Sequence, residues 1–73
     1  MGKLRVLSER EVCAILAQHG FAQVRLRGSH VGMQKRTPEG TTTVLVPDHR
    51  KLRIGTLQPI IRQSRLPRVL FEE

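Results

Sequence analysis

His30 is the residue of this chain best suited to acid–base chemistry. It directly follows Gly28 and Ser29, a pair typical of a two-residue hairpin turn. A neutral imidazole can act as a general base near neutral pH. Arg27 precedes the turn, so we expect a cation beside the imidazole, where it could hold an anionic substrate. The pattern alone leaves open a surface histidine without a role.

The other groups that could catalyse a reaction or bind a metal are scattered. They are His19, His49 and the single cysteine, Cys13. Neither these nor His30 have the short paired spacing of metal ligands, so we predict no metal site. Glycine patterns that bind nucleotides are absent, so we expect no small-molecule cofactor. Cys13 lies in an apolar helical stretch and is predicted to be a buried thiol rather than a nucleophile.

Positive charge is the strongest feature of the composition. Thirteen Lys and Arg face six Asp and Glu, which gives a net charge of +7. Seven of the cations lie in the middle of the chain: Arg25, Arg27, Lys35, Arg36, Arg50, Lys51 and Arg53. Such a patch attracts polyanions, so we predict that these seven residues, with Ser29 at the turn, bind RNA. The alternative is a solvated basic surface that keeps a small protein soluble.

Two helices are expected to support this basic region. The first is predicted over residues 8–19, because Ser8–Glu11 has the spacing of a capping box and apolar residues follow at helical intervals. Gly20 suits the left-handed position just after a helix. A second helix is expected to begin with Thr56 as its N-cap, which puts Pro59 in its first turn. Residues 68–73 are expected to form a short final helix or a strap.

The segment between the helices is predicted to form a hairpin and a third strand. Alternating apolar and polar residues predict a strand up to Arg27. A two-residue turn then pairs Arg27 with His30 and Val24 with Met33. This register puts His30 on the open face of the sheet. Gly32, two residues further on, is expected to leave open space for a ligand.

The third strand is predicted over Thr41–Val46 and is ended by Pro47. The turn before it is uncertain by one residue, which leaves open whether Val44 or Leu45 faces the core. The order helix, strand, strand, strand, helix predicts an α+β fold in which both helices cover one face of a three-stranded antiparallel sheet. This is the arrangement of the double-stranded RNA-binding domain, although other small α+β domains share the order.

The length and hydropathy of the chain limit its organisation. Its 73 residues suffice for one hydrophobic core, so we expect a single domain over residues 1–73. No apolar run is long enough to span a bilayer, and the N-terminus carries no secretion signal. We therefore expect a cytoplasmic protein that does not act at a membrane.

Several motifs, taken in order, resemble the HicA toxins of bacterial and archaeal toxin–antitoxin pairs. They are Gly20-Phe21, Arg27-Gly28-Ser29-His30, Val46-Pro47-Asp48-His49 and Gly55-Thr56-Leu57, followed by Ile60-Ile61 and Gln63. The resemblance covers about residues 8–66. It implies a fold like the double-stranded RNA-binding domain and ribonuclease activity on messenger RNA, with His30 as the catalytic residue. It also implies a HicB-type antitoxin that covers the active face.

Together, charge and resemblance favour a metal-independent endoribonuclease. His30 would take a proton from an RNA 2′-hydroxyl, and Arg27, Lys35 or Arg36 would hold the phosphate. Nothing in the sequence places His49 near His30, so its role stays open. Two alternatives remain: a non-catalytic RNA-binding module of the same fold, and an interaction domain whose basic face meets an acidic partner.

Overall fold

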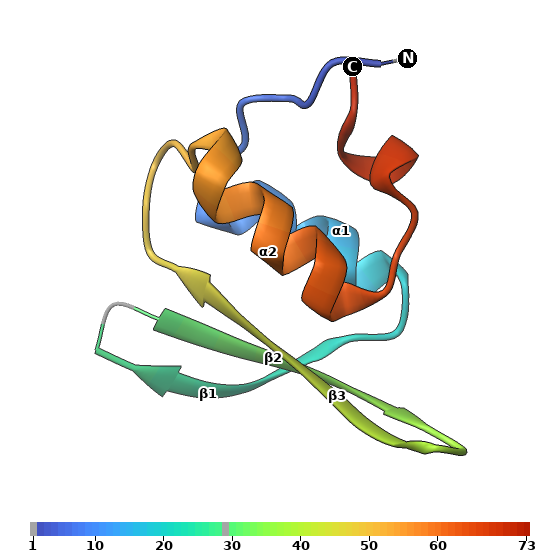
Figure 1. The fold of residues 1–73 in the computed structure, drawn as a ribbon. Helices are drawn as coiled ribbons and strands as arrows, with labels where there is room; N and C mark the ends of the chain where they lie inside the picture. Colours follow the sequence, from blue (N-terminus) through green and yellow to red (C-terminus); the bar gives the residue numbers. More distant parts are fainter. Residues whose placement is uncertain (1, 29) are drawn as a thin grey trace.

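A computed structural model describes residues 2–28 and 30–73, except for the side chains of residues 25–27 (Figure 1). The elements are α1 (Glu9–Gln18), β1 (Ala22–Arg27), β2 (His30–Thr37), β3 (Gly40–Pro47), α2 (Ile54–Ser64) and a short 3₁₀ helix, η1 (Arg68–Phe71). The strands form one antiparallel sheet in the order β1-β2-β3, and both α-helices lie on the same face of it. The predicted α+β fold is therefore confirmed. No helix in the described residues is long and apolar enough to cross a membrane.

The first helix is capped at both ends as predicted. The Ser8 hydroxyl accepts a hydrogen bond from the Glu11 N–H at 3.2 Å, and the Glu11 carboxylate accepts one from the Ser8 N–H at 2.9 Å. At the other end Gly20 has a φ of 94°, and the Phe21 N–H donates to the Leu16 carbonyl at 3.0 Å. This is the Schellman ending that the glycine predicts.

The hydrophobic core lies between the sheet and the two helices. The register of β2 and β3 pairs Val31 with Val46 and Met33 with Val44, and all four side chains are buried. Leu45 is 57% exposed. Because side chains alternate along a strand, Val44 faces the core and Leu45 lies on the open face, which answers the question that the sequence left open.

The first strand departs from the predicted register. A bulge between Gln23 and Arg25 makes Gln23, rather than Val24, the partner of Met33. Val24 is 53% exposed. The predicted pairing of Val24 with Met33 is therefore wrong, because a bulge inserts one extra residue and reverses the facing of the residues before it.

The second helix begins earlier than predicted. Arg53 is its N-cap, and the Arg53 carbonyl accepts hydrogen bonds from the N–H groups of Thr56 at 2.9 Å and Leu57 at 2.8 Å. The prediction of Thr56 as N-cap is wrong, because the helix begins three residues earlier at a cap, Arg53, whose side chain makes no capping hydrogen bond. Pro59 consequently lies in the second turn, where it lacks the N–H that would bond to the Gly55 carbonyl.

The terminal segments pack on this core next to each other (Figure 1). Leu4 forms a β-bridge with Glu72, and Leu7 forms one with Leu52. Of the two predicted possibilities for the C-terminal residues, a short helix or a strap, the structure has the helix η1, in which Phe71 is fully buried.

Candidate functional site

His30 lies at the start of β2, with its side chain on the open face of the sheet. It is the first residue of the strand, and its side chain is exposed, whereas Val31 and Met33 are buried on the helix side. The register pairs it with Arg27 on β1 and with Pro47 on β3. The predicted pairing with Arg27 and the predicted position on the open face are both confirmed.

Two more predicted RNA-binding residues lie on β1 at this end of the sheet, as cross-strand partners of β2 residues. Arg27 pairs with His30, and Arg25 pairs with Gly32. The side chains of both arginines lie outside the described part of the chain, as does the whole of Ser29. Gly32 is buried, so the predicted open space is wrong. β2 is the central strand, so a strand lies on either side of Gly32.

The loop after β3 brings a second histidine to the same end. Pro47 pairs with His30, and the His49 N–H donates to the Pro47 carbonyl at 2.9 Å, so a tight turn separates them. The His49 carbonyl accepts from the N–H of Glu9, the first residue of α1, also at 2.9 Å. The side chains of His30 and His49 are both exposed. The sequence alone could not show this, because it did not fix the register between β2 and β3.

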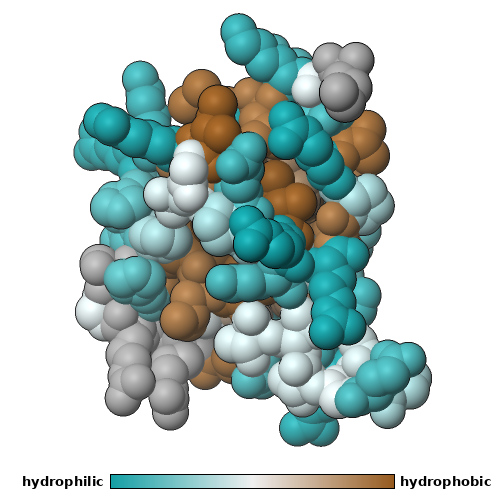
Figure 2. Space-filling model, viewed as in Figure 1, coloured by the Kyte–Doolittle hydropathy of each residue, from teal (hydrophilic) through white to brown (hydrophobic). Residues whose placement is uncertain are grey.

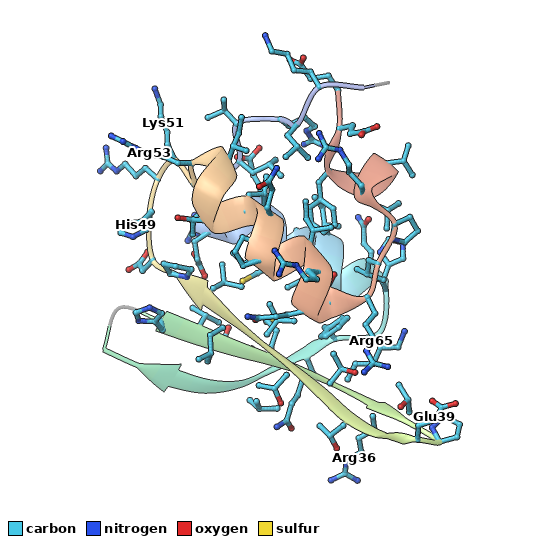
Figure 3. All side chains as sticks on the ribbon, in the orientation of Figure 1. Arg36, Glu39, His49, Lys51, Arg53 and Arg65 are labelled. Carbon is cyan, nitrogen blue, oxygen red and sulfur yellow. The ribbon has the colours of Figure 1, made fainter. Side chains whose placement is uncertain are left out.

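The rest of this loop, residues 48–53, carries positive charge on a fixed backbone, and we call it the basic loop. Leu52 is only 3% exposed, and its N–H donates to the Leu7 carbonyl at 2.7 Å, which anchors the loop in the core. Arg50, Lys51 and Arg53 are exposed around this anchor. In Figure 3 Lys51 and Arg53 extend away from the protein on the same side as His49. Three predicted RNA-binding residues therefore lie on the loop that follows β3, at the same end of the sheet as His30.

Lys35 and Arg36 lie near the other end of β2. The Lys35 ammonium is 5.9 Å from the centre of the Phe21 ring, a cation–π distance, at the end of α1. Alternation along the strand puts Arg36 on the open face, where it is exposed. At about 3.3 Å per residue, the six residues from His30 to Arg36 span about 20 Å. The structure does not bring these two cations to His30.

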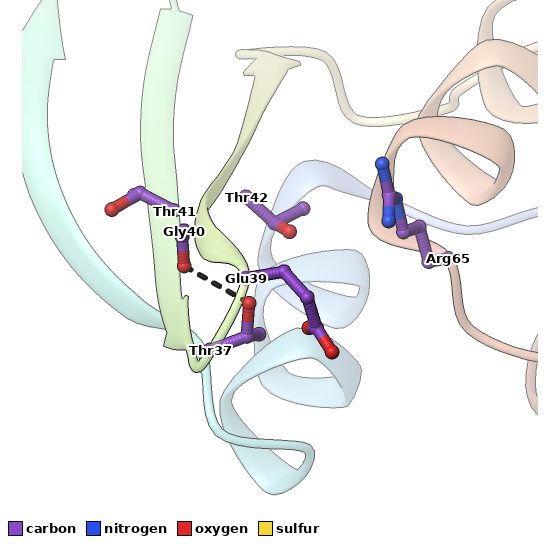
Figure 4. A pocket seen from close by; sticks show the side chains of 6 residues that line it. All are labelled: Thr37, Glu39, Gly40, Thr41, Thr42 and Arg65. Atoms are coloured by element: carbon purple, nitrogen blue, oxygen red, sulfur yellow. Dashed lines mark hydrogen bonds between the residues drawn. The ribbon is translucent and has the colours of Figure 1, made fainter.

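A small depression lies at this far end as well. It has a volume of about 90 Å³ and is lined by Thr37, Glu39, Gly40, Thr41, Thr42 and Arg65 (Figure 4). The Thr37 hydroxyl donates to the Gly40 carbonyl at 3.0 Å across the hairpin tip. Its lining holds no imidazole or thiol, and it lies far from His30.

The thiol of Cys13 is held in a protonated state. It is half-buried against the core and donates to the Glu9 carboxylate at 3.4 Å. Burial, with a smaller effect of Glu9, raises the pKa of the Cys13 thiol to about 12. A thiol with this pKa is a poor nucleophile at neutral pH. In the described residues no three His, Cys, Asp or Glu side chains gather in a group that could hold a metal ion.

Residues 10–66 match the family described as HicA toxin of bacterial toxin-antitoxin. This chain belongs to the HicA family. The match includes the whole sheet, the basic loop and α2. No curated protein matches the chain. As a member of the HicA family, the chain is the toxin of a toxin–antitoxin pair, and its expected partner is a cognate antitoxin.

Proposed function

We propose that this HicA-family chain is an endoribonuclease that cuts messenger RNA without a metal ion and uses His30 as its general base. The observation that carries the proposal is the position of His30: an exposed imidazole on the open face, at the end of the sheet where the basic loop and His49 also lie.

The reaction begins with proton transfer from a ribose 2′-hydroxyl to the imidazole of His30. The 2′-oxygen attacks the adjacent phosphorus, and the bond from phosphorus to the 5′-oxygen breaks. That oxygen takes a proton from a general acid, so the products carry a 2′,3′-cyclic phosphate and a 5′-hydroxyl. Our candidate for the acid is His49 in its protonated form, because its loop folds back beside the partner of His30.

The cations of this end bind the RNA around the cleaved bond. Arg27 shares a row with His30, and Arg50 and Lys51 are exposed on the anchored loop. Positive charge close to the reacting phosphate offsets the negative charge that grows in the transition state. Arg36 is too distant for this effect, so we assign it to a nucleotide several positions along the RNA, on the open face.

The proposal is tested with purified protein, one RNA and a DNA of the same sequence. We expect RNA but not DNA to be cut, with cyclic phosphate ends, because the 2′-hydroxyl is the nucleophile. His30→Ala should lower the rate by about 10² to 10⁴, the usual contribution of a general base. The matched control is His19→Ala: His19 Nδ1 hydrogen-bonds the Ile15 carbonyl at 2.9 Å, at the opposite end of α1 from the His49 loop.

Two outcomes would overturn the mechanism. Ends with a 3′-hydroxyl and a 5′-phosphate would show that water, not the ribose, attacks phosphorus. If cells that accumulate wild type and cells that accumulate His30→Ala show equal growth arrest and equal transcript damage, His30 is not the general base. The non-catalytic RNA-binding module would then be the better description.

A further inference from the structure

Strand β3 forms one edge of the sheet, and its register shows which backbone groups point outward. Pairing with β2 is unbroken from the hairpin tip, where Thr37 pairs with Gly40 across a two-residue loop. The pair that closes such a loop is hydrogen-bonded, and hydrogen-bonded and non-bonded pairs then alternate. The N–H and C=O groups of Thr41, Thr43 and Leu45 therefore point away from β2.

Two observations support this assignment. The next residue in the outward series is Pro47, whose carbonyl accepts the His49 N–H from outside the sheet. Among residues 2–28 and 30–73 no hydrogen bond reaches the outward backbone groups of Thr41, Thr43 and Leu45. Three donors and three acceptors thus lie in a row along the edge.

From Thr41 to Val46 the β3 edge has none of the features that usually prevent strand pairing. Thr41–Val46 contains no charge, no proline and no bulge, and five of its six residues are β-branched. In Figure 2 the lower right of the surface, where Figure 1 has the tip of β2 and β3, is mostly pale and of intermediate hydropathy. The opposite edge, β1, is interrupted by its bulge and carries Arg25 and Arg27. Bulges and charges are the common protections of an edge strand.

Positive charge surrounds the β3 edge and indicates what would pair with it. Arg36 shares a row with Thr41 on the open face. Arg65 lines the depression beside Thr41, and Arg62, one turn earlier on α2, is exposed. Glu39 is the acid in the same depression. A second copy of this chain would bring another +7 charge, so an acidic partner is favoured.

We propose that an acidic β-strand of the cognate antitoxin pairs with β3 at Thr41, Thr43 and Leu45 and extends the sheet. The proposal rests on membership of the HicA family and is independent of the role of His30. Strands in a sheet are about 4.8 Å apart, so the added strand would lie about 10 Å from β2. Its acidic side chains on the open face would oppose RNA beside His30. Binding at the edge would therefore also inhibit the toxin.

Hydrogen exchange measured residue by residue tests this pairing on the wild-type chain, alone and in complex with its co-expressed antitoxin. In the chain alone, we expect fast exchange of the three outward amides and slow exchange of Thr42, Val44 and Val46, whose N–H groups face β2. In the complex, Thr41, Thr43 and Leu45 should slow at least tenfold. Unchanged exchange at these three residues would overturn the proposal. Protection that appears in the chain alone and rises with concentration would also overturn it, in favour of self-pairing.

A pair of variants at one position gives a second measurement. Thr43→Pro removes an outward N–H without removing a bond to β2, whereas Thr43→Val keeps the N–H and the branched shape. We expect the Kd of the complex to rise at least tenfold for the proline variant and to stay near wild type for the valine variant. Equal Kd values for folded variants would contradict the proposal, and the exchange measurement decides the matter if the proline variant does not fold.

RNA cleavage by the same samples separates this proposal from the proposed function. If the chain cuts no RNA but the antitoxin protects the edge amides, the docking proposal stands and the proposed nuclease function fails. If the chain cuts RNA but its edge amides exchange equally fast in the complex, the nuclease function stands and the docking proposal fails.

Discussion

The two ends of β2 are both positively charged, yet they differ in what else is near. The His30 end has a second histidine and a loop held by backbone hydrogen bonds from Glu9 to His49 and from Leu52 to Leu7. The far end has a two-residue hairpin tip, a small depression and no histidine in its lining. Charge alone therefore does not identify the site. What distinguishes the His30 end is that two exposed histidines and the exposed cations of an anchored loop lie at the same end of the sheet.

Distance gives this comparison its functional meaning. Arg36 is about 20 Å along the strand from His30. Exposed charges interact little beyond the Debye length, which is about 8 Å at physiological salt. In the proposed mechanism a cation at the far end would bind another part of an RNA chain and would lie too far from His30 to stabilise the transition state. Substitutions at the two ends should accordingly change different kinetic quantities.

After that of His30→Ala, the largest expected effect concerns His49. We expect His49→Ala to lower kcat by about 100-fold, with little change in KM, because loss of a general acid acts on the chemical step. Single-turnover cleavage at saturating protein measures it. A substrate with sulfur in place of the leaving 5′-oxygen needs no protonation of the leaving group, so it should restore cleavage by His49→Ala but not by His30→Ala. Equal behaviour of the two variants on that substrate would remove His49 as the acid.

A smaller effect is expected when cations are removed from either end. The double variant Arg50→Ala with Lys51→Ala should weaken binding of short and long RNAs alike and should reduce the slope of log K against log salt by about 1.4, at about 0.7 per contact with a single strand. Arg36→Ala should reduce the slope by about 0.7, and only for RNAs long enough to reach from His30 to the far end. Binding to uncleavable 2′-deoxy-substituted RNAs of two lengths measures both. Weakened binding of the short RNA by Arg36→Ala would mean that the two ends form one site.

The sequence was sufficient where local patterns determine structure. The capping box at Ser8 and Gly20 after α1 act over a few residues, and each predicted its feature correctly. The predicted pairing of Arg27 with His30 was also correct. The bulge near Val24 and the N-cap of α2 depend on packing between distant segments, and no short pattern marked them.

The position of His49 and the outward groups of the β3 edge could be predicted only with the register of the sheet known. One residue of uncertainty in the turn before β3 left the facing of every side chain in that strand open. The structure resolves this ambiguity by pairing Thr37 with Gly40. With this register Pro47 pairs with His30, and the loop that contains His49 lies at the His30 end of the sheet.

The smallest expected effect is on stability and comes from the cap that supports the His49 loop. Ser8 caps α1 directly before Glu9, whose N–H holds the His49 carbonyl. Ser8→Ala should cost about 1 kcal/mol, which corresponds to a fall in Tm of roughly 4–8 °C for a domain of this size. Calorimetry measures the change. If Ser8→Ala lowers kcat as well as Tm, while a variant of equal Tm at the far end keeps kcat, then the cap positions the loop.

The pH dependence of this cap has a definite sign. The hydrogen bond from the Ser8 N–H, followed in size by one from the Ser8 hydroxyl, lowers the pKa of the Glu11 carboxyl below its ordinary 4.5. A carboxyl whose pKa is lower in the folded state stabilises the fold above its unfolded pKa, and this stabilisation is lost as the pH falls through the folded value. The Tm advantage of wild type over Glu11→Gln should thus be full near pH 7 and should shrink below about pH 4.5. A Tm difference that stays constant from pH 7 to pH 3 would show that the ionised carboxylate contributes nothing to the cap.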